Sequence, residues 1–377
     1  MKEKIKIIHI LNSVGGVDVA LRLILENLDS KIFKSIAIHG INDTTTPYLD
    51  DKGEEVEEYK ISIQRDISLF KDFKALIKAL RIIKREKPDL IHAHSAKGGI
   101  LGKTIGAILN IPSFHTPQAY SYLSAQGWFK RSMYLRLERM TSFANSKVLA
   151  SSQSEMNRAL KEVKYKKEKV LLFNNSITAS QDVSQLSINK TWPDNYICSV
   201  GRPSYQKNIE MMIRVLAEVK HKQSEVHLVL MGIGYHSPNL SKIDKLITYL
   251  GLTENVTLLP WTSREDIFNI ISNARFYIST ARYEGLPYSI IETLMLGKAC
   301  VATDCDGNRD LIQDGYNGFL VPQEDIVEMS EKIVRLHLDS QLRKGFEVNA
   351  VELFERNFNM EKNIEQLEKI YETEVRS

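Results

Sequence analysis

The stretch YICSVGRPSYQKNIEMMIRVLAEVK (residues 196–220) contains an apolar run, a polar loop and an amphipathic segment, in that order. The apolar run YICSV is short and mixes aromatic with β-branched residues, which predicts a buried strand. From Ile209 onward, apolar residues recur every three to four positions, which predicts a helix that begins near Asn208. A strand, a loop and a helix form the repeating unit of a parallel sheet covered by helices.

The same alternation of strands and helices extends through most of the chain. Upstream the strand-like runs are KIKIIHIL, KSIAIHG, DLIHAH and IPSFHT, and downstream they are VHLVLMG, VTLLP and FYIST. The polar segment at residues 178–195 interrupts the alternation, which is typical of an interdomain linker. We therefore predict an α/β protein with two Rossmann-like, doubly wound domains (residues 1–178 and 179–355) facing each other across a cleft. A C-terminal helix over residues 356–377 is expected to pack back toward the first domain.

The composition is that of a soluble globular protein. The chain has 377 residues, of which 43% are hydrophobic and 26% charged, and this length favours two domains. No apolar run approaches the ~18 residues needed to span a bilayer, and the N-terminus is expected to form a strand and not a signal peptide. The three cysteines match no zinc-site spacing, which favours a reducing, cytoplasmic compartment.

Charge is divided unevenly between the two halves of the chain. Residues 1–178 contain 29 Lys and Arg against 19 Asp and Glu, a net charge of +10, whereas residues 179–377 have a net charge of −7. A basic half is expected to meet an anionic partner. No nucleic-acid-binding module is recognisable, so we expect peripheral contact with an anionic membrane through the cation-rich segments 128–140 and 161–170. The alternative is that these segments are basic helices packed on the domain.

Two basic residues lie in the loop of the stretch quoted above. Arg202 and Lys207 follow the strand and precede the helix, so they belong to the carboxyl edge of the second sheet, where open α/β sheets bind ligands. The planar donor fork of Arg and the point charge of Lys suit two adjacent phosphates. The alternative is a basic loop that only caps the helix.

Two glutamates lie farther along, in EGLPYSIIE (residues 284–292). Pro287 favours a helix start and Gly297 a helix end, which places Glu284 in the loop and Glu292 in the second helical turn. At ~1.5 Å per residue they would lie ~12 Å apart, farther than the ~5 Å or ~6.5–9.5 Å of glycosidase carboxyl pairs. The pair therefore suits opposite ends of one extended ligand, and the alternative is two solvated side chains.

Three motifs taken together, GR-x4-KN, EGLP-x4-E and DG-x-NGFLVP, closely resemble those of the retaining GT-B glycosyltransferases of family 4. The resemblance covers essentially the whole chain, and the combined spacing is highly specific. It implies that Arg202 and Lys207 hold the diphosphate of a nucleotide-sugar donor. It also implies that Glu292 binds the ribose hydroxyls and that Glu284 faces the transferred sugar.

The resemblance implies further donor contacts through backbone and apolar groups. The amides of Gly285 and Leu286 are expected to touch the sugar or the phosphate, at a helix N-terminus that favours anions. The base is expected near the strand end VTLLPW, where Leu259 and Trp261 are candidates. Residues of these types are more often simple core or loop residues.

The N-terminal half is expected to bind the acceptor. Gly15 and Gly16 separate the first strand from the first helix and allow a phosphate or acceptor to approach the backbone closely, although ordinary tight turns use such a pair equally often. His115 ends a strand, and the resemblance implies that it reaches the donor sugar near the reacting bond. A lone histidine at such a place is otherwise structural. The absence of GxGxxG counts against a nicotinamide dinucleotide.

A second histidine pattern lies in the strand DLIHAH. His92 and His94 could be read as metal ligands, but the sequence shows no third ligand. GT-B enzymes generally use no catalytic metal, so the resemblance implies no metal and no cofactor other than the nucleotide-sugar substrate. Lys97 and Lys103, in the helix that follows, are expected to help receive a phosphate-bearing acceptor.

One functional hypothesis follows from these expectations. The segments HSAKGGILGK and HTPQAYSYL resemble the branch of the family that builds bacterial surface polysaccharides on lipid-linked sugars. We expect transfer of a hexosyl or N-acetylhexosaminyl unit, with retention, from a nucleotide sugar (UDP favoured) to a hydroxyl of a glycan or lipid-linked sugar, in the cytoplasm or at the inner face of the membrane. The alternatives are a GT-B nucleotide-sugar 2-epimerase and a non-catalytic nucleotide- or glycan-binding protein.

Overall fold

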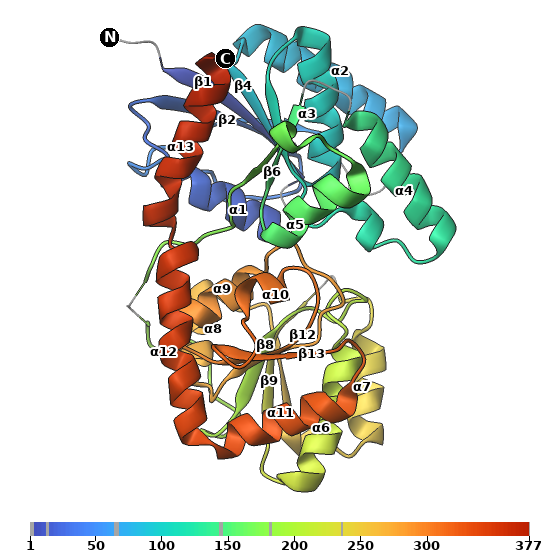
Figure 1. The fold of residues 1–377 in the computed structure, drawn as a ribbon, viewed down its shortest axis with the longest axis vertical. Coiled ribbons are helices and arrows are strands. Elements are labelled where there is room, and N and C mark those ends of the chain that lie inside the picture. The colour runs from blue at the N-terminus through green and yellow to red at the C-terminus, as the bar shows by residue number, and fades with distance from the viewer. Residues whose placement is uncertain are drawn as a thin grey trace. The chain divides into compact units, whose positions relative to one another are not determined.

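The structure is a computed structural model that describes residues 4–12, 15–63, 68–142, 146–180, 183–234 and 237–376. The chain divides into two compact units (Figure 1). Unit 1 comprises Met1–Thr178 and Asn359–Ser377, and unit 2 comprises Ala179–Phe358. Each unit contains one parallel sheet with helices packed on both of its faces (Figure 1).

The sheet of unit 1 has seven strands in the order β3-β2-β1-β4-β5-β6-β7. Its strands are β1 (Ile5–Ile10), β2 (Phe33–Gly40), β3 (Glu57–Ile61), β4 (Leu90–His94), β5 (Ser113–Thr116), β6 (Ser146–Ala150) and β7 (Val170–Leu172). Its helices are α1 (Gly16–Leu25), α2 (Leu69–Glu86), α3 (Ser95–Leu109), α4 (Trp128–Thr141), α5 (Gln153–Arg158) and α13 (Met360–Arg376).

The two faces of this sheet are packed differently. Because alternate residues of a strand point to opposite faces, Ile8 and Ile10 join one aliphatic core together with buried residues of α2 and α3. On the other face, the Tyr371 ring of α13 contacts the rings of Phe33 and Phe114. Helix α13, drawn in red in Figure 1, therefore completes the core of unit 1 although it is the last element of the chain.

The sheet of unit 2 has six strands in the order β10-β9-β8-β11-β12-β13. Its strands are β8 (Ile197–Val200), β9 (Leu228–Ile233), β10 (Val256–Pro260), β11 (Tyr277–Ser279), β12 (Cys300–Thr303) and β13 (Gly318–Val321). Its helices are α6 (Ile209–Lys222), α7 (Leu240–Tyr249), α8 (Arg264–Asn273), α9 (Tyr288–Met295), α10 (Asn308–Leu311), α11 (Ile326–Leu338) and α12 (Ser340–Asn357).

The predicted strand, loop and helix at residues 196–220 are confirmed. The run YICSV supplies β8, and α6 begins at Ile209 directly after Asn208. Residues 356 and 357 belong to α12, so the last helix begins later than predicted, at Met360.

The segment predicted as a linker contains no helix or strand in its described parts, 178–180 and 183–195. Its Ser187 is fixed to unit 2, because the amide and hydroxyl of Ser187 donate to the Asp266 carboxylate at 2.7 and 2.6 Å. Among the described helices, none combines the length and apolar character required to cross a lipid bilayer.

Both sheets reverse their strand order at one place. In unit 1 this switch point lies between β1 and β4, and in unit 2 it lies between β8 and β11. Open α/β sheets bind ligands at the carboxyl ends of the strands that flank such a point. The loops that carry GR-x4-KN and EGLP follow β8 and β11, so both motifs lie at the switch point of unit 2.

Candidate functional site

The loops that leave β8 and β11 are joined by hydrogen bonds. The Thr280 hydroxyl lies within donating distance of the carbonyl oxygens of Lys207 (3.1 Å) and Asn208 (3.0 Å). The amide of Arg282 donates to the carbonyl oxygen of Gln206 at 2.8 Å. The loop of the first motif is therefore fixed against the loop of the second, across the switch point of unit 2.

Lys207 and Glu284 meet where these loops touch. Lys207 Nζ lies 2.8 Å from Glu284 Oε1, and Gln206 Nε2 donates to Glu284 Oε2 at 2.9 Å. The Glu284 residue is only 8% exposed, so these partners replace water around its carboxylate. The glycine of the first motif leaves room for the lysine stem, because a Cβ at Gly201 would lie 3.2 Å from Lys207 Cδ. The structure thus brings together two of the predicted site residues.

Gly307, which the sequence analysis did not single out, supports Glu284 from behind. It follows β12 with a φ of 81° and a ψ of −50°, a conformation that residues with a Cβ rarely adopt. A Cβ at Gly307 would lie 2.8 Å from Glu284 Cβ and 3.0 Å from the carbonyl oxygen of Gly285. The loop after β12 can therefore approach the EGLP loop only with glycine at this position. The Asp-Gly-Asn signal after the strand CVAT was the one available clue.

Glu292 forms a second ion pair at the same edge of the sheet. Helix α9 begins at Tyr288, so Glu292 lies in its second turn, as predicted. Arg264, the first residue of α8, places Nε and Nη2 at 3.1 and 3.0 Å from Glu292 Oε1. Burial raises the pKa of Glu292, and the Arg264 guanidinium opposes that shift. Sequence reasoning missed Arg264, because nothing in the run TSREDIF connects it with α9.

The other predicted donor residues belong to the same unit. Arg202 is half-buried in the loop that follows β8, and Gly285 is buried in the loop that follows β11. Leu286 and Leu259 are buried, the latter in β10. Trp261 is exposed directly after that strand. The donor contacts of these residues remain predictions.

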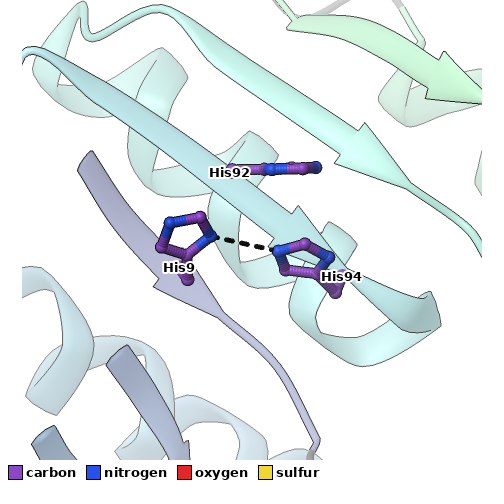
Figure 2. A group of neighbouring side chains, drawn as sticks. All are labelled: His9, His92 and His94. Carbon is purple, nitrogen blue, oxygen red and sulfur yellow. Dashed lines mark hydrogen bonds between the residues drawn. The ribbon is translucent and has the colours of Figure 1, made fainter. Parts of the chain in front are cut away.

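Unit 1 has a cluster of three histidines at its own switch point (Figure 2). His9 of β1 pairs in register with His92 of β4, so both side chains and that of His94 point to one face of the sheet. His9 Nδ1 and His94 Nε2 lie 3.3 Å apart, and the ring centroids of His92 and His94 are 4.0 Å apart with the ring planes tilted by 38°. The sequence showed no third metal ligand beside the HxH pair, but the structure adds His9.

The hydrogen bonds of this cluster decide whether it fits a metal ion. Thr116 Oγ1 donates to the carbonyl oxygen of Leu149 (2.8 Å), so it must accept from His92 Nε2 (2.9 Å). His92 Nδ1 then accepts from the Tyr371 hydroxyl (2.6 Å), and no lone pair of His92 remains for a metal. Two imidazoles remain, fewer than the three protein ligands that a catalytic zinc site uses. As packed, the cluster does not fit such an ion.

Burial keeps these imidazoles neutral. It lowers the pKa of His9 and of His92, and it lowers the pKa of His94 to about 3. His9 Nε2 and His94 Nδ1 are buried and have no hydrogen-bond partner among the described residues. The cluster therefore remains uncharged at neutral pH.

His115 lies on the opposite face of the sheet, because its register partner in β4 is Ala93. Its Nε2 donates to the carbonyl oxygen of Ser95 at 3.1 Å. Nδ1 therefore carries the lone pair, and it has no partner among the described residues. Burial lowers the pKa of His115, so the ring is neutral. A neutral His115 can accept a hydrogen bond from a hydroxyl group, but the predicted contact with donor sugar is untested.

The remaining predictions in unit 1 have different outcomes. Gly15, with a φ of 63°, precedes Gly16, the first residue of α1, and both are exposed. Lys97 Nζ pairs with Asp72 at 2.6 Å. The prediction for Lys103 is wrong: its side chain is 1% exposed and its Nζ is held by Glu138 (3.3 Å) and Thr141 Oγ1 (2.8 Å). Burial between α3 and α4 withholds this cation from an acceptor.

Two family models match the chain in tandem. Residues 14–181 match "Glycosyltransferase Family 4", and residues 180–352 match "Glycosyl transferases group 1". The chain belongs to the family 4 glycosyltransferases and has the GT-B fold. The predicted family and fold class are confirmed.

Known proteins resemble this glycosyltransferase over nearly its whole length. The Escherichia coli UDP-Gal:alpha-D-GlcNAc-diphosphoundecaprenol alpha-1,3-galactosyltransferase is 24% identical, over 98% of this chain and 97% of that protein. The sucrose-phosphate synthase from Thermosynechococcus elongatus has a TM-score of 0.84 at 20% identity, covering 98% and 99% of the two chains. Anabaena HepE in complex with UDP-glucose has a TM-score of 0.79 at 18% identity, covering 98% and 99%. At these identities, the two solved structures support the fold alone.

Proposed function

We propose that this glycosyltransferase moves a hexosyl or N-acetylhexosaminyl unit from a UDP-sugar to a hydroxyl of a glycan or lipid-linked sugar, in bacterial surface-polysaccharide synthesis. The observation that carries the proposal is the meeting of Lys207 with Glu284, 2.8 Å apart at the switch point of unit 2. A cation can bind the diphosphate while a neighbouring carboxylate accepts hydrogen bonds from the sugar, so the pair suits the junction between the two groups. The Escherichia coli relative, named for a UDP-Gal donor and a diphosphoundecaprenol-linked acceptor, supports both substrate classes.

Lys207 is positioned to exchange one anion for another when donor binds. Without donor, its ammonium group is held by Glu284. In the proposed complex Lys207 and Arg202 donate hydrogen bonds to the donor diphosphate. Glu284 keeps the hydrogen bond from Gln206 and accepts hydrogen bonds from hydroxyl groups of the sugar. Each hydrogen bond to a charged group contributes about 1.5–3 kcal/mol.

The nucleoside end of the donor is assigned to the second ion pair and to β10. Glu292 accepts the ribose hydroxyls, as the resemblance implied. The amides of Gly285 and Leu286, just before α9, approach the phosphate or sugar. The base lies near Leu259 and Trp261, of which the exposed indole of Trp261 can provide a stacking surface.

The proposed reaction retains the anomeric configuration. The bond between the anomeric carbon and the diphosphate oxygen breaks while the acceptor oxygen bonds to the same face of that carbon. A departing diphosphate oxygen takes the acceptor proton, so no separate carboxylate base is needed. Arg202, Lys207 and the N-terminus of α9 stabilise the developing negative charge. Because these groups supply the positive charge, we propose that neither a metal ion nor a resident cofactor takes part.

Unit 1 is proposed to bind the acceptor and to assist the sugar. Gly16, at the N-terminus of α1, leaves backbone amides open to an anionic group. The unprotonated Nδ1 of His115 accepts a hydrogen bond from a hydroxyl group of the donor sugar in this proposal. The contact of His115 requires a neutral imidazole, and the contact at Gly16 requires an unobstructed loop. Neither contact requires Lys103.

Contact with the inner face of an anionic membrane belongs to the same proposal. Along α4, Phe129, Met133, Leu137 and Met140 share one face of the helix and are all exposed, and Trp128 beside them is 81% exposed. Lys130 and Arg136 lie on either side of this stripe in the helical projection. An apolar stripe bordered by cations suits the interface of an anionic bilayer. Flotation with phosphatidylglycerol vesicles should fail for a Trp128→Ala/Phe129→Ala variant, and equal flotation with phosphatidylcholine would contradict the charge argument.

The test of function is transfer by the purified protein. It is incubated with a panel of nucleotide sugars and a diphosphate-lipid-linked N-acetylglucosamine, and products are read by mass spectrometry. We expect the acceptor to gain one hexosyl or N-acetylhexosaminyl mass from a UDP-sugar, with an α-linkage from an α-donor by proton NMR. The Lys207→Ala variant should show almost no product, and Lys242→Ala, which removes an exposed lysine that pairs with Glu210 in the same unit, should match the unaltered protein.

Other outcomes would contradict the proposal in different ways. Isomerised donor without an altered acceptor would indicate the epimerase. Nucleotide binding without any turnover would indicate a binding protein. A product with inverted configuration would support transferase activity and contradict the retaining mechanism.

A further inference from the structure

The Arg264–Glu292 pair is asymmetric in a way that leaves part of each residue open. Both contacts from Arg264 go to Oε1 of Glu292, at 3.1 Å from Nε and 3.0 Å from Nη2. No described residue donates a hydrogen bond to Oε2. The carboxylate is therefore oriented by one oxygen while the other oxygen can receive hydrogen bonds.

Arg264 is held in place and still reaches solvent. Its guanidinium lies over the Phe268 ring, 5.1 Å from the centroid and one helical turn along α8. The Arg264 side chain is 43% exposed, in contrast to the 10% of Glu292. A guanidinium has five N–H donors, and the contacts with Glu292 use two of its nitrogens. The side chain thus has donors left for a bound ligand beside the glutamate.

The chemistry of a ribose requires this carboxylate to be charged. Two vicinal hydroxyls donate best to an ionised carboxylate, and a protonated one loses acceptor capacity. Burial alone favours the protonated form of Glu292, and Arg264 opposes this effect. The nearby cation therefore favours the ionised form, in which a buried glutamate is the better acceptor.

We propose that Arg264 is a positioning residue for the donor nucleoside. It keeps Glu292 ionised and turned so that Oε2 meets the ribose hydroxyls, and it offers its remaining N–H groups to the same part of the donor. This inference rests on the proposed function, because it assumes that Glu292 binds ribose. A merely structural pair would fasten α8 to α9 and leave donor recognition unchanged.

The experiment compares UDP affinity across pH in Arg264 variants. Calorimetric titrations with UDP at pH 6.0, 7.0 and 8.5 are carried out on the unaltered protein, Arg264→Ala, Arg264→Lys and Lys242→Ala. We expect Arg264→Ala to bind UDP about tenfold more weakly at pH 7.0, the equivalent of one charged hydrogen bond. The deficit should shrink at pH 8.5, because Glu292 without its cation ionises only at higher pH. Arg264→Lys should recover most of the affinity, and Lys242→Ala should lose none.

A double substitution separates positioning from packing. Glu292→Gln cannot ionise, so adding Arg264→Ala to it should lower the UDP affinity little further, and by the same factor at every pH. Steady-state kinetics should show a raised donor KM for Arg264→Ala with kcat within about threefold of the unaltered protein, because the residue acts on binding and not on the reacting bond. Rescue by lysine keeps the test valid if the alanine variant folds poorly.

The outcomes that overturn the inference are distinct from those that overturn the function. If the unaltered protein binds UDP and Arg264→Ala binds it equally well at every pH, the inference falls and the function stands. A loss that is constant with pH and additive with Glu292→Gln would also overturn it, since that pattern indicates packing. If the unaltered protein binds no UDP, the UDP donor and the inference fall together.

Discussion

At the switch point of unit 2, two buried acids are held by bases, Glu284 by Lys207 and Glu292 by Arg264. At the switch point of unit 1, three buried imidazoles pack against one another and carry no charge. The strand orders around the two points are the same. The comparison shows that the topology supplies a position for a ligand, and that the side chains decide which ligand it receives. Charged pairs can exchange their partners for an anionic ligand, whereas a cluster of neutral imidazoles has no such charge to offer.

The largest expected effect is on the charged side of this comparison. Substituting Lys207→Ala removes a cation that we propose stabilises the departing diphosphate, so kcat/KM for transfer should fall about 10²–10³-fold, as when one oxyanion donor is lost. Steady-state assays with saturating acceptor measure this loss. Lys242→Ala is the control, because it removes an exposed lysine of the same unit that pairs with a different glutamate, Glu210. A fully active Lys207→Ala variant would leave unit 2 without the role that distinguishes it from unit 1.

A smaller effect is expected behind Glu284. In Gly307→Ala the new Cβ would lie 2.8 Å from Glu284 Cβ, so the carboxylate must move. Displacement of a positioning group by about 1 Å lowers turnover up to roughly 100-fold. The matched control is Gly315→Ala, which has a positive φ of 75° and nothing within 4 Å of the added Cβ. Gly315→Ala should lose about 1–2 kcal/mol of stability through backbone strain, and Gly307→Ala should lose more because its Cβ also meets Glu284. Only Gly307→Ala should lose activity, and equal losses of activity would contradict this account.

The difference between these two predictions also marks how far sequence reasoning reached. Lys207 and Glu284 stand in short motifs beside predicted strands, so βαβ topology places them at one sheet edge without further information. Gly307 and Arg264 act on residues of a different loop or helix. Their contacts depend on how α8 and the β12 loop pack against α9, and no local periodicity encodes that packing.

The same limit explains the errors in unit 1. The third histidine, His9, meets His92 only through the parallel pairing of β1 with β4. Lys103 appears as a solvent-facing cation in sequence, yet Glu138 of α4 neutralises it inside the fold. Strands β3, β6 and β7 were not predicted. The edge strand β3, with the sequence EEYKI, has the polar composition of a loop. The strands and helices with strong periodicity were predicted, and the partners across elements were not.

The neutral side of the comparison predicts an effect on stability. Burial lowers the pKa of His94 to about 3, below the ~6.5 of an unfolded histidine. Between these values the unfolded chain binds a proton that the folded one does not, so stability decreases as pH falls, by about 1.4 kcal/mol per pH unit for each such histidine. His94→Phe should therefore weaken the dependence of the melting temperature on pH between 7.0 and 5.0, as measured by calorimetry. His221→Gln, at an exposed position, should leave the dependence unchanged, and an unchanged slope in His94→Phe would show that the imidazole is protonated in the folded protein.

The smallest effect is expected from removing metal ions. Arg202, Lys207 and the α9 N-terminus are proposed to neutralise the diphosphate, and His92 uses both ring nitrogens on Tyr371 and Thr116. Dialysis against EDTA should therefore leave the transfer rate within about twofold, since no metal-dependent electrostatic term is lost. If EDTA abolished transfer and Zn²⁺ restored it, the His9→Ala variant would show where the metal ion binds. Failure of Zn²⁺ to restore activity in that variant would place the ion at the histidine cluster of unit 1, where His92 would have to release one of its hydrogen-bond partners. Restored activity in that variant would instead place the ion with the diphosphate in unit 2.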